Sequence, residues 1–277
     1  MLDLAVIPAA GRGLNFLPLT KSQPKEMLPL GNKPVVQYVV EELIQNDVRR
    51  ILFITGPDKS AIENHFDTNK DLIRFLRVNG KEEQLAELAF ERNEAAYFYT
   101  RQRHQNGLGQ AVLCAEPFVQ EQPFIVALGD TILGRPQPSR IVQQISDLFI
   151  EQKGAVQAVI AFDELQTREY PLDFGIAKPG KNYGNYFEVD DIVEKPAVNE
   201  APSNLAVAAR YVFSPDIFRY LRQTNPGING EVQLTDAIQA LIRDGGRVLG
   251  VPLPEQDERY DIGTFGSYYR AFAKFAL

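Results

Sequence analysis

Short apolar runs alternate with amphipathic stretches in the first half of the chain, a pattern typical of strands joined by helices. Residues 4–7 are uniformly apolar and end at Pro8 and a glycine-containing loop, which indicates a buried strand that leads into a functional loop. Residues 35–46 have apolar positions at helical spacing behind Pro34, and residues 50–55 form a second apolar run. We therefore expect a βαβ unit whose first strand is central and parallel to its neighbours.

The second half of the chain is richer in strand-like segments. Helical spacing predicts helices over 60–66, 70–78, 81–90, 215–223, 232–243 and 264–276, and apolar or alternating runs predict strands over 95–100, 123–128, 155–162, 174–178, 186–193, 205–213 and 247–251. No repeat, low-complexity tract or linker divides the chain. We expect an α/β fold with a mixed, mostly parallel central sheet flanked by helices, formed by residues 1–277 as a single domain.

Composition and charge narrow the possible functions. The 277 residues carry 29 Lys and Arg against 36 Asp and Glu, a net charge of -7, without a basic run that could follow a phosphate backbone, so nucleic acid is not an expected partner. One cysteine and two histidines exclude a disulfide within the chain and a Cys/His zinc site. The N-terminal residues lack the features of a signal peptide, and no apolar run approaches the ~20 residues of a membrane span, so we expect no membrane partner and a cytoplasmic protein.

Small residues follow the first predicted strand, and an acid follows a later one. The loop Ala9-Ala10-Gly11-Arg12-Gly13 would let backbone N–H groups approach a base, ribose or phosphate. It matches neither a Walker A loop nor a dinucleotide fingerprint, so by itself it fits a structural turn as well as a nucleotide site. Asp130 ends a predicted strand at the sheet edge where ligands bind in open α/β sheets, which favours a functional role for this acid.

A longer pattern carries a family resemblance. The sequence AAGRGLNFLPLTKSQPKEMLPL, residues 9–30, resembles the signature of sugar-phosphate nucleotidyltransferases, and its PKEMLP segment resembles the bacterial UTP-glucose-1-phosphate uridylyltransferase form. Further matching segments follow in order and begin at Glu63, Arg101, Leu128, Asp173, Val193, Pro202, Gly230 and Tyr260. The resemblance implies a Rossmann-like nucleotidyltransferase fold, with a nucleotide-binding part at about 1–135 and a sugar-phosphate-binding and C-terminal part at about 136–277. A thymidylyltransferase specificity is less compatible with Glu26-Met27 and with Glu231-Val232-Gln233.

The resemblance implies transfer of UMP from UTP to glucose 1-phosphate, giving UDP-glucose and pyrophosphate, in a homodimer or homotetramer. Because the attacking phosphate is already ionised, this reaction needs alignment and charge stabilisation and no general base. By similarity Lys25 contacts the triphosphate, Asp130 holds Mg²⁺ between the phosphates, and Asp261 is a second metal ligand. Lys195 pairs with the sugar phosphate, and Arg12 is a further candidate for charge stabilisation. The implied substrate contacts are Ala9, Ala10, Gly11, Gly13, Glu26, Gln102, Gly107, Gly175, Glu194 and Lys195.

Each candidate side chain also has a purely structural alternative when it is taken alone. Lys25 could be a solvated lysine, Asp130 a turn residue and Asp261 an acid at a helix start. Gln102 could be a surface polar residue in a loop, and Glu194 with its neighbouring lysine an exposed charge pair before a proline. Their joint occurrence in ordered matching segments favours function.

The glycine loop departs from the family signature Gly-x-Gly-Thr-Arg at its last two positions, which are Leu14 and Asn15. The family arginine lies against the triphosphate, and loss of one such preorganised contact costs on the order of 10²–10³ in rate. Arg12 or Lys21 could supply the missing charge. The alternative function is that of a catalytically impaired paralogue, which binds nucleotide sugar or regulates an active uridylyltransferase by association.

Overall fold

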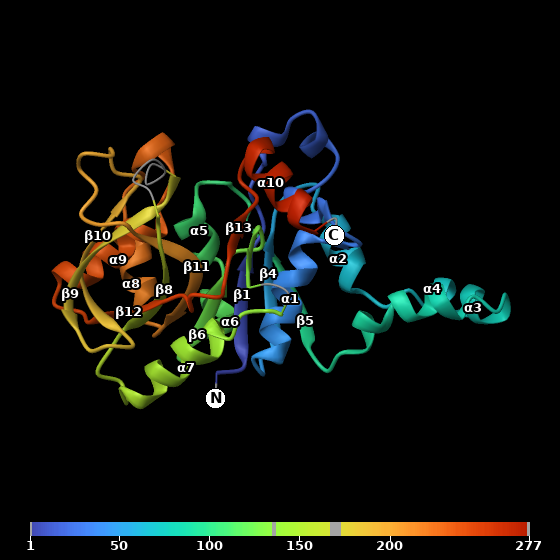
Figure 1. Ribbon diagram of the computed structural model, residues 1–277, viewed down its shortest axis with the longest axis horizontal. Helices are drawn as coiled ribbons and strands as arrows, with labels where there is room; N and C mark the ends of the chain where they lie inside the picture. Colours follow the sequence, from blue (N-terminus) through green and yellow to red (C-terminus); the bar gives the residue numbers. More distant parts are fainter. Residues whose placement is uncertain (1, 135–136, 167–172, 276–277) are drawn as a thin grey trace.

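A nine-stranded sheet forms the centre of the protein in a computed structural model that describes residues 2–134, 137–166 and 173–275 (Figure 1). From edge to edge its strands are β5 (Ala96–Arg101), β4 (Arg50–Thr55), β1 (Leu4–Pro8), β6 (Phe124–Ala127), β11 (Leu205–Phe213), β8 (Ala158–Glu164), β12 (Val248–Pro252), β10 (Phe187–Glu194) and β9 (Gly175–Asn182). β1 pairs in parallel with both β4 and β6, as expected. Within the described residues, only β11 and β10 run against the common direction, which confirms a mixed, mostly parallel sheet.

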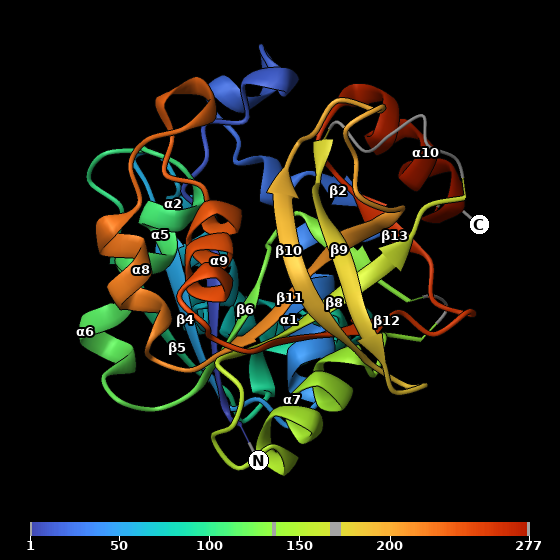
Figure 2. The ribbon, with the colours of Figure 1, turned by 90° about the vertical axis from the view of Figure 1, so that its left-hand side faces the viewer.

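Helices cover both faces of this sheet, because successive side chains of a strand point to opposite faces. Ala5 and Ile7 belong to one buried apolar cluster, whereas Leu4 and Val6 belong to another. The first cluster is covered by α1 (Val35–Gln45), α2 (Ser60–Phe66) and α7 (Ile141–Glu151), and the second by α5 (Leu108–Leu113), α6 (Glu116–Val119), α8 (Ile217–Gln223) and α9 (Leu234–Arg243) (Figure 2). With both faces covered, the ends of the strands are the places where a site can form.

A third apolar cluster forms where α10 (Phe265–Phe275) packs against the segment after the glycine loop. Its buried side chains include Phe16, Leu28 and Tyr268. Next to it, β7 (Thr131–Leu133) pairs antiparallel with β13 (Arg259–Asp261) in a small separate sheet. The helix predicted over 264–276 begins at Phe265, and Ala276 lies outside the described residues. The cluster therefore joins the glycine-loop region to a segment from the far end of the chain.

Two short helices project from the body of the molecule as an arm (Figure 1). They are α3 (Lys70–Val78) and α4 (Glu82–Glu87), at the positions predicted by helical spacing. Phe75 and Val78 on α3 are 56% and 80% exposed, although both are apolar. Each helix in the described part of the chain is too short or too polar to cross a membrane.

Several elements lie in stretches for which we predict no regular structure. α7 has apolar residues at helical spacing, so its signal is present in the sequence. α5 and α6 are only one or two turns long, and β7 and β13 have three residues each, lengths at which no period can be read. Residues 135–136, at the expected boundary between the two parts, lie outside the described residues.

Candidate active site

The glycine loop leaves the carboxyl end of β1 at the sheet edge. Ala9 and Ala10 are buried, and the Ala9 N–H donates to the Ile54 carbonyl at 2.9 Å, which extends the strand pairing into the loop. Gly11 is exposed, and a β-carbon added there would meet no protein atom within 4 Å. Gly13 has a φ of 65°, and a β-carbon there would lie 2.8 Å from the Thr20 side chain. Backbone geometry therefore requires glycine at position 13, whereas position 11 faces open space.

Lys25 and Asp130 form the centre of the candidate site. Lys25 begins the short 3-10 helix η3 (Lys25–Met27), and Asp130 lies between β6 and β7. The Lys25 Nζ atom is 2.5 Å from Asp130 Oδ2, and both side chains are largely shielded from solvent. Burial by itself would lower the pKa of Lys25, but the negative charges of Asp130, Glu26 and Asp261 outweigh it and raise the pKa. Lys25 is thus held as a cation among carboxylates.

Asp261 reaches the same place from β13. It is the register partner of Thr131, whose hydroxyl donates to Asp261 Oδ1 at 3.3 Å, and the Ile262 N–H donates to the Asp130 carbonyl at 2.9 Å. Burial, and then the charge of Asp130, raise the pKa of Asp261 to about 6. Burial and the neighbouring Asp130 thus disfavour the charged form of Asp261, and a cation bound beside the two carboxylates would stabilise that charge.

Within the described residues, no cluster of three or more His, Cys, Asp or Glu side chains is arranged to hold a metal. Asp130 and Asp261 therefore offer two carboxylates and no full protein cage. This limited donor set fits Mg²⁺, which is commonly bound through one or two carboxylates together with waters and substrate phosphates.

The two positions that depart from the family signature lie on η1 (Leu14–Phe16). Leu14 is 63% exposed, and the Asn15 amide donates to the Gly263 carbonyl at 3.0 Å. Asn15 is therefore beside the segment that carries Asp261. It links the glycine loop to that segment but brings no charge to it.

Arg12 points toward a different loop. Its Nε atom donates to Gln105 Oε1 at 2.7 Å, and Gln105 in turn donates to the Ala10 carbonyl at 2.6 Å. The guanidinium remains exposed. Gln105, which we did not predict as a site residue, thus fixes both the glycine loop and its arginine.

Gln102 and Gly107 belong to the loop that Arg12 contacts. Gln102 is 3% exposed, and its amide nitrogen donates to the Gly107 carbonyl and to Gln110 Oε1. Gly107 has a φ of 100°, and a β-carbon there would lie 2.6 Å from the Val232 carbonyl oxygen. Glycine is thus required by this backbone contact, and the amide nitrogen of Gln102 is engaged within its own loop.

Glu26 faces the interior. Its side chain is 2% exposed and lies 2.8 Å from the ammonium of Lys59, which is also buried. A β-carbon at Gly129 would come within 3.5 Å of Glu26 Cγ, so Glu26 also packs beside the residue before Asp130. In the structure Glu26 supports the turn that carries Lys25.

A second group of predicted residues lies at the paired ends of β9 and β10. Gly175 and Glu194 are register partners, and a β-carbon on Gly175 would lie 3.0 Å from Thr235 Oγ1 and 3.4 Å from Glu194 Oε2. Burial raises the pKa of Glu194, and a hydrogen bond from Thr235 opposes the shift. Lys195 is exposed, and its N–H donates to the Phe174 carbonyl at 3.1 Å.

Tyr211 connects the two groups electrostatically. Burial raises the pKa of its hydroxyl, and the charges of Glu194 and Asp130 add to that shift. Both carboxylates thus disfavour ionisation of the buried Tyr211 hydroxyl.

Comparison with known proteins identifies the family of the chain. Residues 4–276 match the protein family described as Nucleotidyl transferase. The chain is 41% identical to the UTP--glucose-1-phosphate uridylyltransferase of Bacillus subtilis over 273 residues, which cover 99% of this chain and 90% of that protein. It is also 41% identical to UTP--glucose-1-phosphate uridylyltransferase 2 of Staphylococcus saprophyticus, with 99% and 91% covered. The chain belongs to the UTP-glucose-1-phosphate uridylyltransferase family.

Solved structures of uridylyltransferases have the same fold. A crystal structure of UDP-glucose pyrophosphorylase complexed with UDP-glucose is 33% identical with a TM-score of 0.87, and covers 99% of this chain and 98% of its own. The UTP-bound enzyme from Acinetobacter baumannii is also 33% identical with a TM-score of 0.87, at 99% and 93% coverage.

Some residues around this candidate site are not among those predicted from the sequence. Thr235 lies in the matching segment that begins at Gly230, but a single threonine there does not by itself indicate a site residue. Arg210 and Glu42 are buried beneath the Asp130 loop and are 0% and 1% exposed. A charged residue within the apolar run 205–213 could have signalled Arg210, because arginine is almost never fully buried without a partner.

Proposed function

We propose that this protein transfers UMP from UTP to glucose 1-phosphate and releases pyrophosphate and UDP-glucose. The observation that carries the proposal is the meeting of Lys25, Asp130 and Asp261 beside the glycine loop. In the reaction a phosphate oxygen of glucose 1-phosphate bonds to the α-phosphorus of UTP. The bond from that phosphorus to the oxygen bridging to the β-phosphate breaks, and pyrophosphate leaves with the electron pair.

The side chains of the site align and neutralise two polyanions. Lys25 contacts the triphosphate, and Lys195 pairs with the phosphate of the sugar. Glu194 accepts hydrogen bonds from sugar hydroxyls, beside the close backbone approach at Gly175. Positive charge held in place costs little reorganisation during the reaction and therefore stabilises the transition state.

The nucleoside is bound by the two loops that Gln105 connects. Ala9, Ala10, Gly11 and Gly13 present backbone to the nucleotide, and the open space at Gly11 supports this role. Gln102 and Gly107 lie on the loop opposite. Arg12 reaches the phosphates when it exchanges its exposed contact with Gln105 for the substrate.

Asp130 and Asp261 hold Mg²⁺ in this proposal. These two carboxylates would hold the ion where it would screen the repulsion between the phosphates of the two substrates. Support comes from Asp261, whose pKa is raised by burial and by the charge of Asp130, and from the ammonium of Lys25, which forms an ion pair with Asp130. Glu26 acts indirectly, because it positions Lys25 through the turn that Lys59 anchors.

The rival function, nucleotide-sugar binding or regulation without turnover, rests on Asn15. It is not favoured, because the similar proteins over nearly the whole chain are named as uridylyltransferases. The decisive experiment incubates purified protein with UTP, glucose 1-phosphate and Mg²⁺ and follows pyrophosphate. We expect turnover in the ordinary enzymatic range of ~1–10³ per second, loss of turnover in EDTA, and poor use of dTTP and galactose 1-phosphate.

A matched variant makes the assay specific. Lys25→Gln should abolish turnover, whereas the exposed Lys178→Gln, with the same change in charge, should not affect it. Tight binding of UDP-glucose without turnover in the wild type would instead support the regulatory function.

We further propose that the nucleotide-binding and sugar-phosphate-binding parts act as one cytoplasmic unit, which assembles as a homodimer or homotetramer. The continuous sheet supports a single unit formed by the two parts. The exposed apolar Phe75 and Val78 of the arm support assembly of several chains. Light scattering should give a mass of two or four chains, and Val78→Asp should lower it if the arm is the contact. A monomeric wild type would contradict this assignment.

A further inference from the structure

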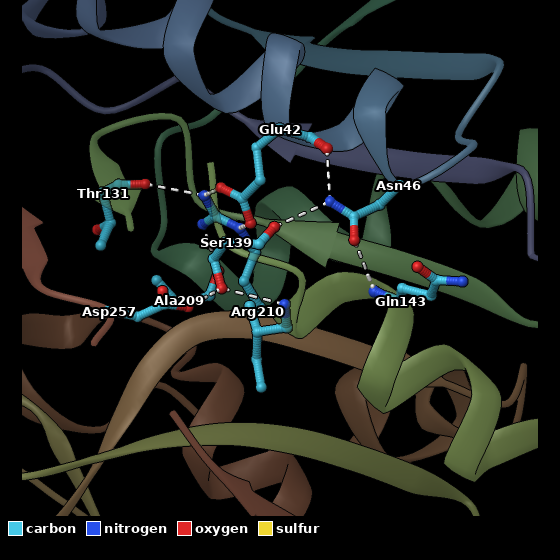
Figure 3. A network of polar contacts seen from close by, with 9 residues as sticks. Glu42, Asn46, Thr131, Ser139, Gln143, Ala209, Arg210 and Asp257 are labelled. Carbon is cyan, nitrogen blue, oxygen red and sulfur yellow. Dashed lines mark hydrogen bonds and ion pairs between the residues drawn. The ribbon is translucent and has the colours of Figure 1, made fainter. Parts of the chain in front are cut away.

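A fully buried ion pair contacts the backbone of Thr131, the residue after Asp130 (Figure 3). Arg210 on β11 and Glu42 on α1 are 0% and 1% exposed. The guanidinium donates from Nε to Glu42 Oε1 at 3.0 Å and from Nη2 to Glu42 Oε2 at 2.6 Å. Burying two charges costs free energy that their attraction rarely exceeds, and apolar pairs of similar volume are often as stable. A contribution to folding stability therefore does not by itself explain why a buried ion pair is present at this position.

The remaining donors of Arg210 bind the backbone around Asp130. Nη2 donates to the Thr131 carbonyl at 3.0 Å, directly after Asp130, and Nη1 donates to the Ala209 carbonyl at 3.0 Å. The Ala209 carbonyl also accepts from the Leu128 N–H at 3.1 Å. Arg210 therefore fixes both ends of the short turn that carries Asp130.

The backbone beside Arg210 is unusual in a way that supports this contact. Ala209 has a φ of 60°, in the left-handed region, and it lies in the irregularity where the pairing of β11 with β8 skips from Val207 to Tyr211. Such a backbone is costly for alanine and persists where surrounding contacts hold it. Here it coincides with the point at which Arg210 and Tyr211 enter the site region.

The same network reaches Asp257, two residues before the strand that carries Asp261. The Ser139 hydroxyl donates to the Asp257 carboxylate, and the Ser139 carbonyl accepts from the Asn46 amide at 3.0 Å, one turn along α1 from Glu42. The Gly134 N–H donates to the Glu258 carbonyl at 3.0 Å. Both strands of the β7–β13 pair are thus attached to one polar network that is centred on α1.

We propose that Glu42 and Arg210 are positioning residues, which set the placement of Asp130 relative to Asp261 and thereby the site's affinity for its divalent cation. This inference rests on the proposed function, in which the two aspartates hold that cation. The pair touches neither substrate nor the reacting atoms. It acts through the Thr131 carbonyl and the turn at Asp130.

The test removes the pair without leaving a lone buried charge. The double variant Glu42→Leu/Arg210→Met is apolar and of similar volume, so we expect it to fold and to melt within a few degrees of the wild type. Arg210→Lys keeps the charge but lacks the planar fork that reaches Glu42 and Thr131 together. Glu188→Leu/Arg247→Met removes an ion pair between β10 and the residue directly before β12 and serves as the control.

The readout is UDP-glucose binding by calorimetry in EDTA and in Mg²⁺, alongside the Mg²⁺ concentration for half-maximal turnover. Loss of a partner that orients a metal ligand typically weakens metal affinity by roughly 10–100-fold. We expect the double variant and Arg210→Lys to lose most of the tightening of UDP-glucose binding that Mg²⁺ produces and to need roughly 10-fold more Mg²⁺, with binding in EDTA unchanged. The control should match the wild type.

A folded double variant whose Mg²⁺ response lies within twofold of the wild type would overturn the positioning role. Failure of both variants to fold would also overturn it, because the pair would then be required for folding itself. A wild type that binds UDP-glucose with an Mg²⁺ response but has no turnover would contradict the proposed function instead, so the two failures are distinguishable.

Discussion

Replacing Asp261 with asparagine should stabilise the metal-free protein at neutral pH. Asparagine keeps the oxygen that accepts from the Thr131 hydroxyl but removes a negative charge that is buried beside Asp130. Burial raises the pKa of Asp261 to about 6 from an ordinary value of 3.8. The folded protein binds the proton of Asp261 more tightly than the unfolded chain does. The stabilisation that results from this proton is fully present below pH 3.8 and is lost as the pH rises through about 6.

The size of the effect follows from the shift. About two pKa units correspond to about 3 kcal/mol in the free energy of unfolding at pH 7.5. The corresponding cost at pH 5 is about half as large, because the folded-state carboxyl is then mostly protonated. For a chain of this size about 3 kcal/mol is equivalent to roughly 6 °C in Tm.

The assay is thermal unfolding in EDTA at pH 5 and pH 7.5. The Asp261→Asn variant should melt above the wild type at both values, with the larger difference at pH 7.5. Glu255→Gln makes the same charge change in an exposed loop six residues earlier and should have little effect. Addition of Mg²⁺ with UTP should stabilise the wild type more than Asp261→Asn. A variant that melts at or below the wild type at pH 7.5 would refute the burial argument.

Three further substitutions test other parts of the site. Asn15→Arg should raise turnover, since it restores positive charge beside the Asp261 segment, and an unchanged rate would mean that another cation already supplies this charge. Gly175→Ala places a β-carbon 3.0 Å from Thr235 Oγ1 and should raise the KM for glucose 1-phosphate several-fold while the KM for UTP stays constant; equal changes in both constants would contradict a sugar-side role. Gly107→Ala combines a φ of 100° with a contact of 2.6 Å to the Val232 carbonyl and should lower the Tm, on the order of 1–3 kcal/mol in stability; an unchanged Tm would show that the loop can move freely.

The sheet, the glycine loop and the position of Asp130 at the end of a strand could be predicted, because each has a pattern in a short stretch of sequence. The glycine loop directly follows the apolar run 4–7, and Asp130 follows the predicted strand that ends at residue 128. The structure places Lys25 and Asp130 in direct contact. That contact joins residues 105 positions apart, and the sequence did not predict it: the family resemblance implied only that Lys25 contacts the triphosphate and that Asp130 holds Mg²⁺.

Other features depend on tertiary contacts that no local pattern contains. The meeting of Asp130 with Asp261 requires the register of two three-residue strands. The inward orientation of Glu26 requires Lys59 from a separate segment. Similarly, the amide nitrogen of Gln102 binds its own loop because of the way that residues 107–110 fold back on it.

The pairing of β7 with β13 also means that Asp130 and Asp261 are synthesised at different times. Asp261 follows Asp130 by 131 residues, which at ~5–20 residues per second takes the ribosome roughly 7–26 s. Throughout that interval the growing chain displays one acidic side chain without its counterpart. The two aspartates can therefore meet only after all strands of the nine-stranded sheet have been synthesised. We expect nascent chains that lack Asp261 to have no transferase activity.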